Sequence, residues 1–413
     1  MRTSLVPILL AVLLTAWPLP QPPGGAHAAA APASEASPWA DDFDAVWRIT
    51  GERFFDPDMR GVDWNAARAR YAERAAAAPD LATFAEVVNE MLGELRSSHT
   101  RLYTDRDPEY YFLRAVFRDA FRTPPPEWDD AGLVTVTTPQ GTFVRDLLDG
   151  GPAAKAGLRV GDRLLGHFHP VETFEGRSGR PVTLAVQSEP GGPSRRVDVF
   201  PRRVGAQRAY LEATQASIRR IPLPGGRGEA GYIRLWALTH PRFLQVLEDA
   251  LAGFDGTAGL VLDLRGGFGG RSEDYLDLFM RSGTGRIETV DRRGRRRPFF
   301  VGWDRPIVVL VDGGTRSAKE LLAWSLARAG RARLVGTRTA GAVLASRAFP
   351  IGRNALLLVA VTDLLADGVR LEGRGIEPHV VVEAPLPYRG GADPQLDRAL
   401  DELAAMAAPR EGG

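Results

Sequence analysis

Cysteine is absent from the 413-residue sequence. Its absence excludes disulfide bonds, thiolate metal sites, a cysteine nucleophile and a lipid-anchored cysteine. It suits an oxidising environment outside the cell, where no thiol can mispair. Any covalent nucleophile in this chain is therefore expected to be a hydroxyl.

Lysine is almost absent as well. Of 52 Lys and Arg residues, only Lys155 and Lys319 are lysines, so chemistry that needs a lysine base has two candidates. The formal net charge is +1, which excludes a broad basic field for nucleic acid. With 44% hydrophobic and 25% charged residues, the composition is typical of a globular protein with a substantial core. The length predicts about two or three domains.

Long apolar runs are confined to the N-terminus. Arg2 precedes an apolar stretch at 5–17, and Ala-His-Ala at 26–28 is typical of a cleavage site. We expect a signal peptide at 1–28, a disordered Ala/Pro/Ser-rich spacer at 29–38, and a secreted or periplasmic mature chain that does not span a membrane. The alternative is an uncleaved membrane anchor, but the run is short for a spanning helix and ends in prolines.

Helical periodicity dominates residues 39–127. Apolar residues at i, i+3 and i+4 predict a helix after Trp39, a second over 64–78 and a third from Asp80 onward. Asp63 is expected to cap the second helix. We assign this range to an N-terminal helical domain that carries His99.

Residues 128–204 change to short β-like runs. Strands are expected at 133–137, 142–147, 182–186 and 196–200. Between them, residues 151–162 read GPAAKAGLRVGD, which predicts a short helix and a tight turn before a strand at 163–165. This segment closely resembles the most recognisable part of PDZ domains, so we expect an inserted, β-rich PDZ-like domain over 128–204.

Strands alternate with helices in residues 205–390. Strands are expected at 230–235, 259–264 and 305–312, and helices at 241–254, from Ser272 and at 318–329. Continuous apolar strands indicate a sheet buried on both faces, and the alternation indicates parallel crossovers. The fold class is therefore α/β, with a C-terminal helix and tail at 391–413.

A serine follows one of the buried strands. The segment Asp312-Gly-Gly-Thr-Arg-Ser317-Ala318 predicts a glycine turn and then a helix N-terminus. Ser317 can project its hydroxyl from this turn, and the unpaired amide of Ala318 can hold a developing oxyanion. The alternative is that Ser317 merely caps the helix.

A glycine-rich loop, residues 263–270, follows the preceding strand. Glycines there let the backbone approach a ligand closely. The spacing matches neither a P-loop nor a dinucleotide-binding loop. A backbone N–H donor or a substrate-binding edge remains.

With these motifs the chain resembles a known family, the C-terminal processing (tail-specific) serine proteases, together with the tricorn protease core. Six motifs occur in the family's order: 95–100, the PDZ-like domain, 263–270, 312–320, 336–341 and 367–378. The resemblance implies an α/β protease core of the crotonase/ClpP-like spiral type over 205–390. It also implies a serine peptidase activity that needs no cofactor and no metal.

The family activates its serine in two ways. One branch uses a lysine, but that position holds Ala342, Lys155 lies in the PDZ-like turn, and Lys319 at i+2 from Ser317 points away from it. The tricorn-like branch uses Ser, His, Ser and Glu, and the resemblance places these roles on residues that are present. It implies Ser317 as nucleophile, His99 as general base, and Ser98 and Glu372 as the groups that orient the site.

The resemblance also implies backbone donors and a rival base. The oxyanion donors would be the amides of Ala318 and Gly269. Among the other histidines, His379 beside the Glu372 motif is the only serious rival to His99. Arg316 replaces a small residue next to the nucleophile, and we expect it to attract a substrate carboxylate.

The PDZ-like part is expected to bind a peptide C-terminus. PDZ domains add an extended peptide as a strand and capture its carboxylate with backbone amides. The matching residues are Gly132, Leu133 and Val134, which implies polypeptide partners with free C-termini. The alternative is a structural lid without peptide affinity.

Three functions remain open at this stage. The first is an exported serine endopeptidase that cleaves unfolded or C-terminally recognised polypeptides through an acyl-enzyme. The second is a decayed protease that binds peptides or ligands, since the same core resembles retinoid-binding repeats. The third, a PDZ scaffold that recruits partners, leaves the α/β core unexplained.

Overall fold

In the computed structural model of this chain, residues 38–280, 287–299 and 302–407 are described. The expected signal peptide and most of the spacer lie outside the described residues. In the part of the chain that is described, no helix is both long and apolar enough to cross a membrane.

The N-terminal helices form as expected. They are α1 (Ala40–Arg53), α2 (Trp64–Ala76) and α3 (Leu81–Gly93), followed by α4 (Pro108–Val116). Asp63 caps α2 by accepting a hydrogen bond from the Ala66 amide at 2.9 Å. Asp80 caps α3 in the same way, from Thr83 at 2.8 Å. Both carboxylates satisfy an amide that has no partner inside the helix.

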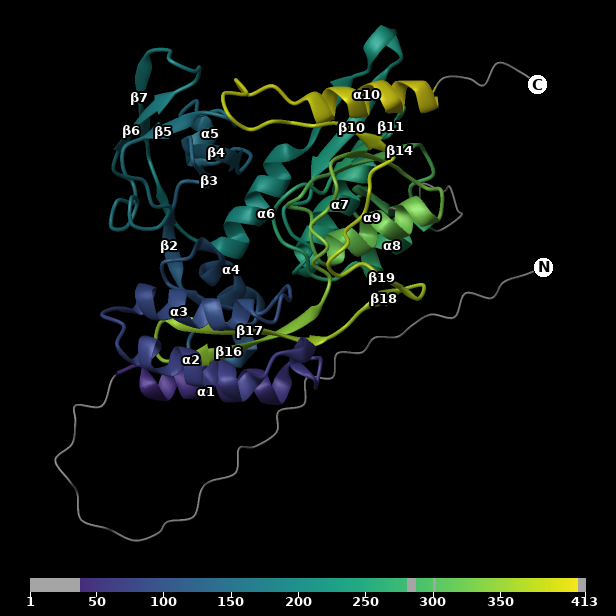
Figure 1. The fold of residues 1–413 in the computed structure, drawn as a ribbon. Coiled ribbons are helices and arrows are strands. Elements are labelled where there is room, and N and C mark those ends of the chain that lie inside the picture. The colour runs from purple at the N-terminus through teal and green to yellow at the C-terminus, as the bar shows by residue number, and fades with distance from the viewer. Residues whose placement is uncertain (1–37, 281–286, 300–301, 408–413) are drawn as a thin grey trace, which may run out of the picture. The chain divides into compact units, whose positions relative to one another are not determined.

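A hairpin from the far end of the chain completes this region. The antiparallel strands β16 (Ala345–Ile351) and β17 (Ala355–Thr362) form a three-stranded sheet with β1 (Arg101–Thr104). Leu357 and Val359 of β17 pack in one apolar cluster with Phe84 and Met91 of α3. Residues 345–362 fall in the range expected for the core, yet they pack with the helices α1–α3 of the N-terminal region (Figure 1).

An antiparallel five-stranded sheet follows. Its order is β3 (Leu133–Thr138), β4 (Gly141–Leu147), β5 (Arg163–Leu165), β6 (Val182–Gln187) and β7 (Ser194–Val199), with the short helix α5 (Pro152–Lys155) between β4 and β5. The predicted strands and helix are confirmed. Strand β3 lies at the edge of the sheet. A ribbon of β2 (Glu127–Asp130) paired with β8 (Arg202–Gly205) joins this unit to the rest of the chain.

The α/β core is a six-stranded sheet. Its order is β20 (Val380–Val381), β15 (Arg333–Gly336), β14 (Ile307–Val311), β11 (Gly259–Asp263), β10 (Glu229–Arg234) and β9 (Arg219–Pro222). All neighbours are parallel except β9 with β10. The helices are α6 (Ala206–Ser217), α7 (Pro241–Gly253), α8 (Glu273–Met280), α9 (Ala318–Arg328) and α10 (Pro394–Ala407). Two hairpins, β12 (Ile287–Val290) with β13 (Arg296–Phe299) and β18 (Leu365–Ala366) with β19 (Val369–Arg370), project from it.

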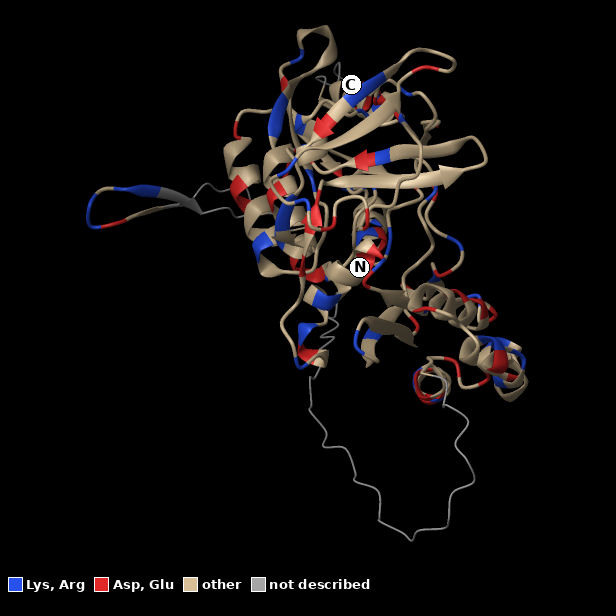
Figure 2. Ribbon diagram, turned by 90° about the vertical axis from the view of Figure 1, so that its left-hand side faces the viewer, with Lys and Arg blue, Asp and Glu red and all other residues tan. Residues whose placement is uncertain are grey.

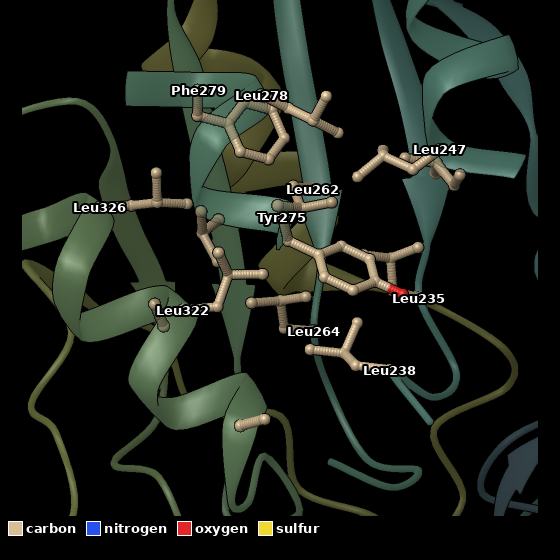
Figure 3. Packing of buried hydrophobic residues seen from close by; sticks show 14 of the residues in the cluster. Leu235, Leu238, Leu247, Leu262, Leu264, Tyr275, Leu278, Phe279, Leu322 and Leu326 are labelled. Carbon is tan, nitrogen blue, oxygen red and sulfur yellow. The ribbon is translucent and has the colours of Figure 1, made fainter. Parts of the chain in front are cut away.

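The central strands are buried on both faces, as their continuous apolar sequence predicts. On one face, Leu262 packs with Phe279 of α8 and Leu322 of α9 (Figure 3). On the other, Val261 and its neighbours pack with Leu403 of α10. Burial on both faces holds the carboxyl ends of β11 and β14 rigidly, and those ends lead into the glycine loop and the serine turn.

The charged residues are mixed over the fold. Lys and Arg alternate with Asp and Glu along the ribbon (Figure 2). Some of these charges join the parts of the chain. Arg234 of β10 donates to Asp146 of β4 at 2.8 Å, and Trp236 donates to Asp149 at 3.0 Å. The five-stranded sheet is therefore tied to the core by buried polar contacts.

Candidate active site

Ser317 lies in a sharp turn between β14 and α9. Its backbone has φ 57° and ψ −132°, a conformation that residues other than glycine avoid. Its amide donates to the Ala342 carbonyl at 2.7 Å, which holds the strained turn in place. Ser317 occupies the N-cap position of α9, but its side chain makes no capping hydrogen bond. The structure therefore contradicts the alternative that this hydroxyl only caps the helix.

Ser98, His99 and Glu372 form a hydrogen-bonded chain. The Ser98 Oγ lies 2.9 Å from His99 Nδ1 and 2.9 Å from Glu372 Oε2. The Ser98 amide donates to Glu372 Oε1 at 3.0 Å, and the Val343 amide donates to Oε2 at 3.0 Å. Ser98 and Glu372, 274 positions apart in the sequence, are thus hydrogen-bonded to each other.

The hydrogen bonds of Ser98 and Glu372 determine which ring nitrogen of His99 carries the proton. Both oxygens of Glu372 accept hydrogen bonds from amides, so the Ser98 hydroxyl gives its single proton to Oε2. The Ser98 oxygen must then accept from His99, which places the ring proton on Nδ1. Nε2 is left with a lone pair, the form that a general base needs.

His99 is held neutral by its surroundings. Burial is the largest effect and lowers its pKa to about 4, opposed by the charge of Glu372 and reinforced by that of Arg316. Its backbone is also strained, with φ 57°. Among the described residues, no hydrogen bond joins His99 Nε2 to the Ser317 hydroxyl. The structure brings three of the four predicted side chains into contact and leaves Ser317 unbonded to the base.

Gly269 lies directly against Ser317. A Cβ at this position would come within 2.5 Å of Ser317 Cβ, 2.9 Å of its Oγ and 2.9 Å of the Ala318 amide nitrogen. Only glycine fits there. Among the described residues, the amides of Gly269 and Ala318 have no hydrogen-bond acceptor. Their residues lie next to Ser317, so the oxyanion role expected for these two amides stays a prediction.

Glu320 supports the serine turn, and the sequence reasoning missed it. The buried carboxylate accepts from Thr339 Oγ1 at 2.5 Å and from the amides of Gly341 and Ala342 at 2.8 Å each. It thereby fixes the carbonyl of Ala342 that receives the Ser317 amide. Burial raises the pKa of Glu320, against the hydrogen bonds that lower it. The Ser-x-x-Glu spacing of a capping box was the available signal, although the glutamate is used differently here.

Lys319 supports the glycine loop. Its side chain is fully buried, and Nζ donates to the Gly266 carbonyl at 2.9 Å. Burial lowers its pKa to about 7, helped by the charge of Arg234.

The rival base is engaged elsewhere. His379 Nδ1 accepts from the Leu334 amide at 2.9 Å. His240 caps α7 by accepting from the Arg242 amide at 3.1 Å. Both rings thus act as hydrogen-bond acceptors for the backbone. In the described residues, no group of three or more His, Asp or Glu side chains could hold a metal ion.

A cavity of about 270 Å³ opens beside this site. Its walls include the predicted peptide-binding residues Gly132, Leu133 and Val134, and also Phe268 and Arg316 of the core. Trp128, Tyr210 and Trp236 add aromatic surface. The edge strand β3 and the loop next to the nucleophile thus share one cavity.

The comparisons with known proteins agree with this geometry. Residues 229–382, which contain the glycine loop, Ser317 and Glu372, match peptidase family S41, and residues 36–93 match the tricorn protease C1 domain. The region that carries Ser317 and Glu372 is thus similar to the peptidases of family S41. The remaining residues of the site, Ser98 and His99, directly follow the part that matches the tricorn domain.

Two proteins similar to this chain are carboxyl-terminal-processing proteases. The chain is 29% identical over 273 residues to one from Bartonella bacilliformis, with 59% of each chain covered, and 28% identical over 384 residues to one from Synechocystis sp., with 86% and 85% covered. The aligned part thus spans less than two thirds of the Bartonella protein. A solved structure, the photosystem II D1 C-terminal processing protease, shares the fold at a TM-score of 0.53 with 23% identity, covering 90% of this chain and 99% of that one.

Proposed function

We propose that this protein is a serine peptidase of family S41, an exported endopeptidase that cleaves polypeptides near a recognised C-terminus through an acyl-enzyme on Ser317. The observation that supports this most directly is the Ser98–His99–Glu372 chain, which leaves the His99 Nε2 lone pair free to act as a base. The strained Ser317, whose side chain makes no capping hydrogen bond, is the proposed nucleophile. The carboxyl-terminal-processing relatives support the substrate class. The expected signal peptide supports export.

The proposed chemistry uses only side chains and amides of this chain. Ser317 Oγ attacks the peptide carbonyl and its proton passes to His99 Nε2, while the amides of Gly269 and Ala318 stabilise the oxyanion. The C–N bond then breaks, and His99 gives the proton to the leaving amine. Water then attacks the ester and gives a proton to His99. The bond between the acyl carbon and Ser317 Oγ breaks, His99 returns the proton to Oγ, and the product leaves as a free carboxylic acid. Since Ser317 and His99 are not hydrogen-bonded in this structure, we propose that substrate closes the gap between them.

The PDZ-like unit would position the substrate. Strand β3 is an unpaired sheet edge, to which an extended peptide can add as another strand. The cavity at its start continues to the glycine loop, so a bound C-terminus lies near the nucleophile. Arg316 in the same cavity supplies a positive charge for the substrate carboxylate.

Active-site labelling tests this function. A fluorophosphonate probe is expected to label the wild-type protein and to fail with Ser317→Ala, while His99→Ala slows labelling by at least 100-fold. The residual rate should reflect the free amides alone. Thermal unfolding of each variant checks that the fold survives.

The alternative, a decayed protease that only binds peptides, predicts a different result. Wild-type protein would then bind peptides but take no label. Labelling that persists in Ser317→Ala would show that another serine is the nucleophile. The presence of all four side chains of the site argues for the active enzyme.

A further inference from the structure

In the loop around Gly132, which is expected to bind a peptide carboxylate, a side chain of the protein already bonds to the backbone. Asp130 Oδ1 accepts a hydrogen bond from the Gly132 amide at 2.7 Å. Gly132 is one of the donors that a peptide C-terminus would use. The Asp130 side chain thus takes the place that the proposed function gives to a substrate carboxylate.

Asp130 has little else to neutralise it. The residue is 5% exposed at the end of β2, and among the described residues it makes no ion pair. Its cross-strand neighbour is Arg202 of β8, but that guanidinium bonds to Glu212 instead. A charge that is buried without a partner is costly, so this position favours a neutral acid more than a surface aspartate would.

The residue also faces the substrate cavity. Asp130 lines the same cavity as Gly132, Leu133 and Val134. An incoming C-terminal carboxylate that bonds to the Gly132 amide would lie against the Asp130 carboxylate. Two carboxylates in direct contact cannot both be ionised without a large free-energy penalty, so one of them must take up a proton.

We propose that Asp130 is a specificity-determining residue that keeps a peptide's C-terminal carboxylate off the Gly132 amide while Asp130 is ionised and admits it once Asp130 is protonated. This rests on the proposed peptide-binding role of the loop. One proton moves from solvent to Asp130, the bond from the Gly132 amide shifts to the peptide carboxylate, and the new O–H of Asp130 donates to that carboxylate.

The surroundings set the pH at which this exchange occurs. Burial raises the pKa of Asp130 to about 6, while the Gly132 amide and the charge of Arg202 lower it. Other charged or titratable groups also face the cavity or Asp130. They are Glu109 of α4, Arg145 and Asp146 of β4, Tyr210 of α6 and Arg316 of the serine turn. Free-acid peptides are thus expected to bind well below about pH 6 and progressively more weakly above it.

Binding measured without turnover tests the idea. In a Ser317→Ala background, the Kd of a fluorescent peptide ending in a free carboxylate is followed from pH 5 to 8.5, beside the same peptide with a C-terminal amide. The Kd of the free acid should rise about tenfold per pH unit above pH 6, while that of the amide stays level. Asp130→Asn keeps a neutral oxygen for the Gly132 amide. It should abolish the slope and tighten free-acid binding about 100-fold at pH 8.

Asp129→Asn is the matched control. Asp129 is equally buried at 5% exposure and also accepts an amide bond, from Gly176, but it does not line the cavity. It should leave the pH slope unchanged.

Three results would overturn the proposal. They are a flat wild-type slope for the free acid, an Asp130→Asn variant that binds it like wild type at pH 8, or an Asp129→Asn variant with the same effect. These outcomes do not affect the peptidase function, which the fluorophosphonate label tests separately.

Discussion

At the scale of single residues, the two groups that would exchange a proton are both under strain. Ser317 and His99 each have φ 57°, and conformations of this kind cost about 1–3 kcal/mol. The strain is held by specific bonds, from the Ser317 amide to Ala342 and from His99 Nδ1 to Ser98. The same placement puts His99 close enough to Arg316 for the cation to affect its protonation.

The pH dependence of the reaction should report this arrangement. Because the pKa of His99 is lowered to about 4, the acid limb of kcat/KM for an amidated peptide should lie near pH 4 instead of near 6.5. Arg316→Gln removes a cation that disfavours the charged imidazolium, so the limb should move to higher pH. The variant should also lose preference for free-acid over amidated peptides.

An exposed arginine provides the control for this prediction. Arg353 lies in the turn between β16 and β17, and Arg353→Gln should leave both the limb and the preference as in wild type. If the acid limb of kcat/KM in Arg316→Gln lies at the same pH as in wild type, Arg316 does not act on His99. An unchanged ratio of free-acid to amide hydrolysis would remove its role in carboxylate attraction.

At the scale of elements, the serine turn depends on a neighbouring loop. Strand β14 and helix α9 supply the two ends of the turn, but the loop at 339–342 supplies the carbonyl that holds the Ser317 amide. Glu320 on the first turn of α9 fixes that loop through three hydrogen bonds. The position of the nucleophile is therefore decided by a helix and a loop together.

Removing this carboxylate should disturb both stability and rate. Glu320→Ala leaves two buried amides and a hydroxyl without an acceptor, which should lower the free energy of unfolding by about 1–3 kcal/mol in urea titrations. It should also lower kcat more than it raises KM, since the Ser317 turn loosens. Glu86→Ala, on the exposed face of α3, should change the unfolding free energy by less than about 0.5 kcal/mol. Full activity in Glu320→Ala would mean that the loop is held by other contacts.

At the scale of the whole molecule, the site is assembled from distant parts of the chain. His99 follows the N-terminal helices, Glu372 and Val343 flank the β16–β17 hairpin, and Ser317 belongs to the central sheet. The hairpin packs in one apolar cluster with α1–α3. Because His99 follows these helices and Glu372 follows the hairpin, this packing brings the two residues close together. The five-stranded sheet is joined to the core in turn by Asp146 and Arg234.

That ion pair should couple the two parts measurably. Its side chains are only 11% and 17% exposed, so Asp146→Asn leaves Arg234 buried without its partner and should lower the free energy of unfolding by about 3–5 kcal/mol. Arg234→Met combined with Asp146→Asn should restore part of this loss, which a double-mutant cycle in urea detects. Strictly additive effects would show that the pair does not join the sheet to the core.

Much of the secondary structure could be predicted from local sequence. The helices at 64–78, 241–254 and 318–329 correspond to α2, α7 and α9, and the strand at 259–264 corresponds to β11. Their apolar period and capping residues are local features. The packing of β16–β17 under the N-terminal helices could not be read in this way, because it pairs residues more than 250 positions apart.

The sequence by itself, through its resemblance to the C-terminal processing proteases, predicted the type of chemistry. It has no cysteine, only two lysines, and an alanine where the lysine branch of that family has its base, so it predicts a hydroxyl nucleophile with histidine as the base. Only the tertiary structure decided how these groups meet. It places the proton of His99 on Nδ1, sets Glu320 behind the serine turn and puts Asp130 on the Gly132 amide. The physical reason is that the type of each residue is known from the sequence alone. Its burial, its hydrogen-bond partners and the protonation state that they impose arise only when distant segments pack together.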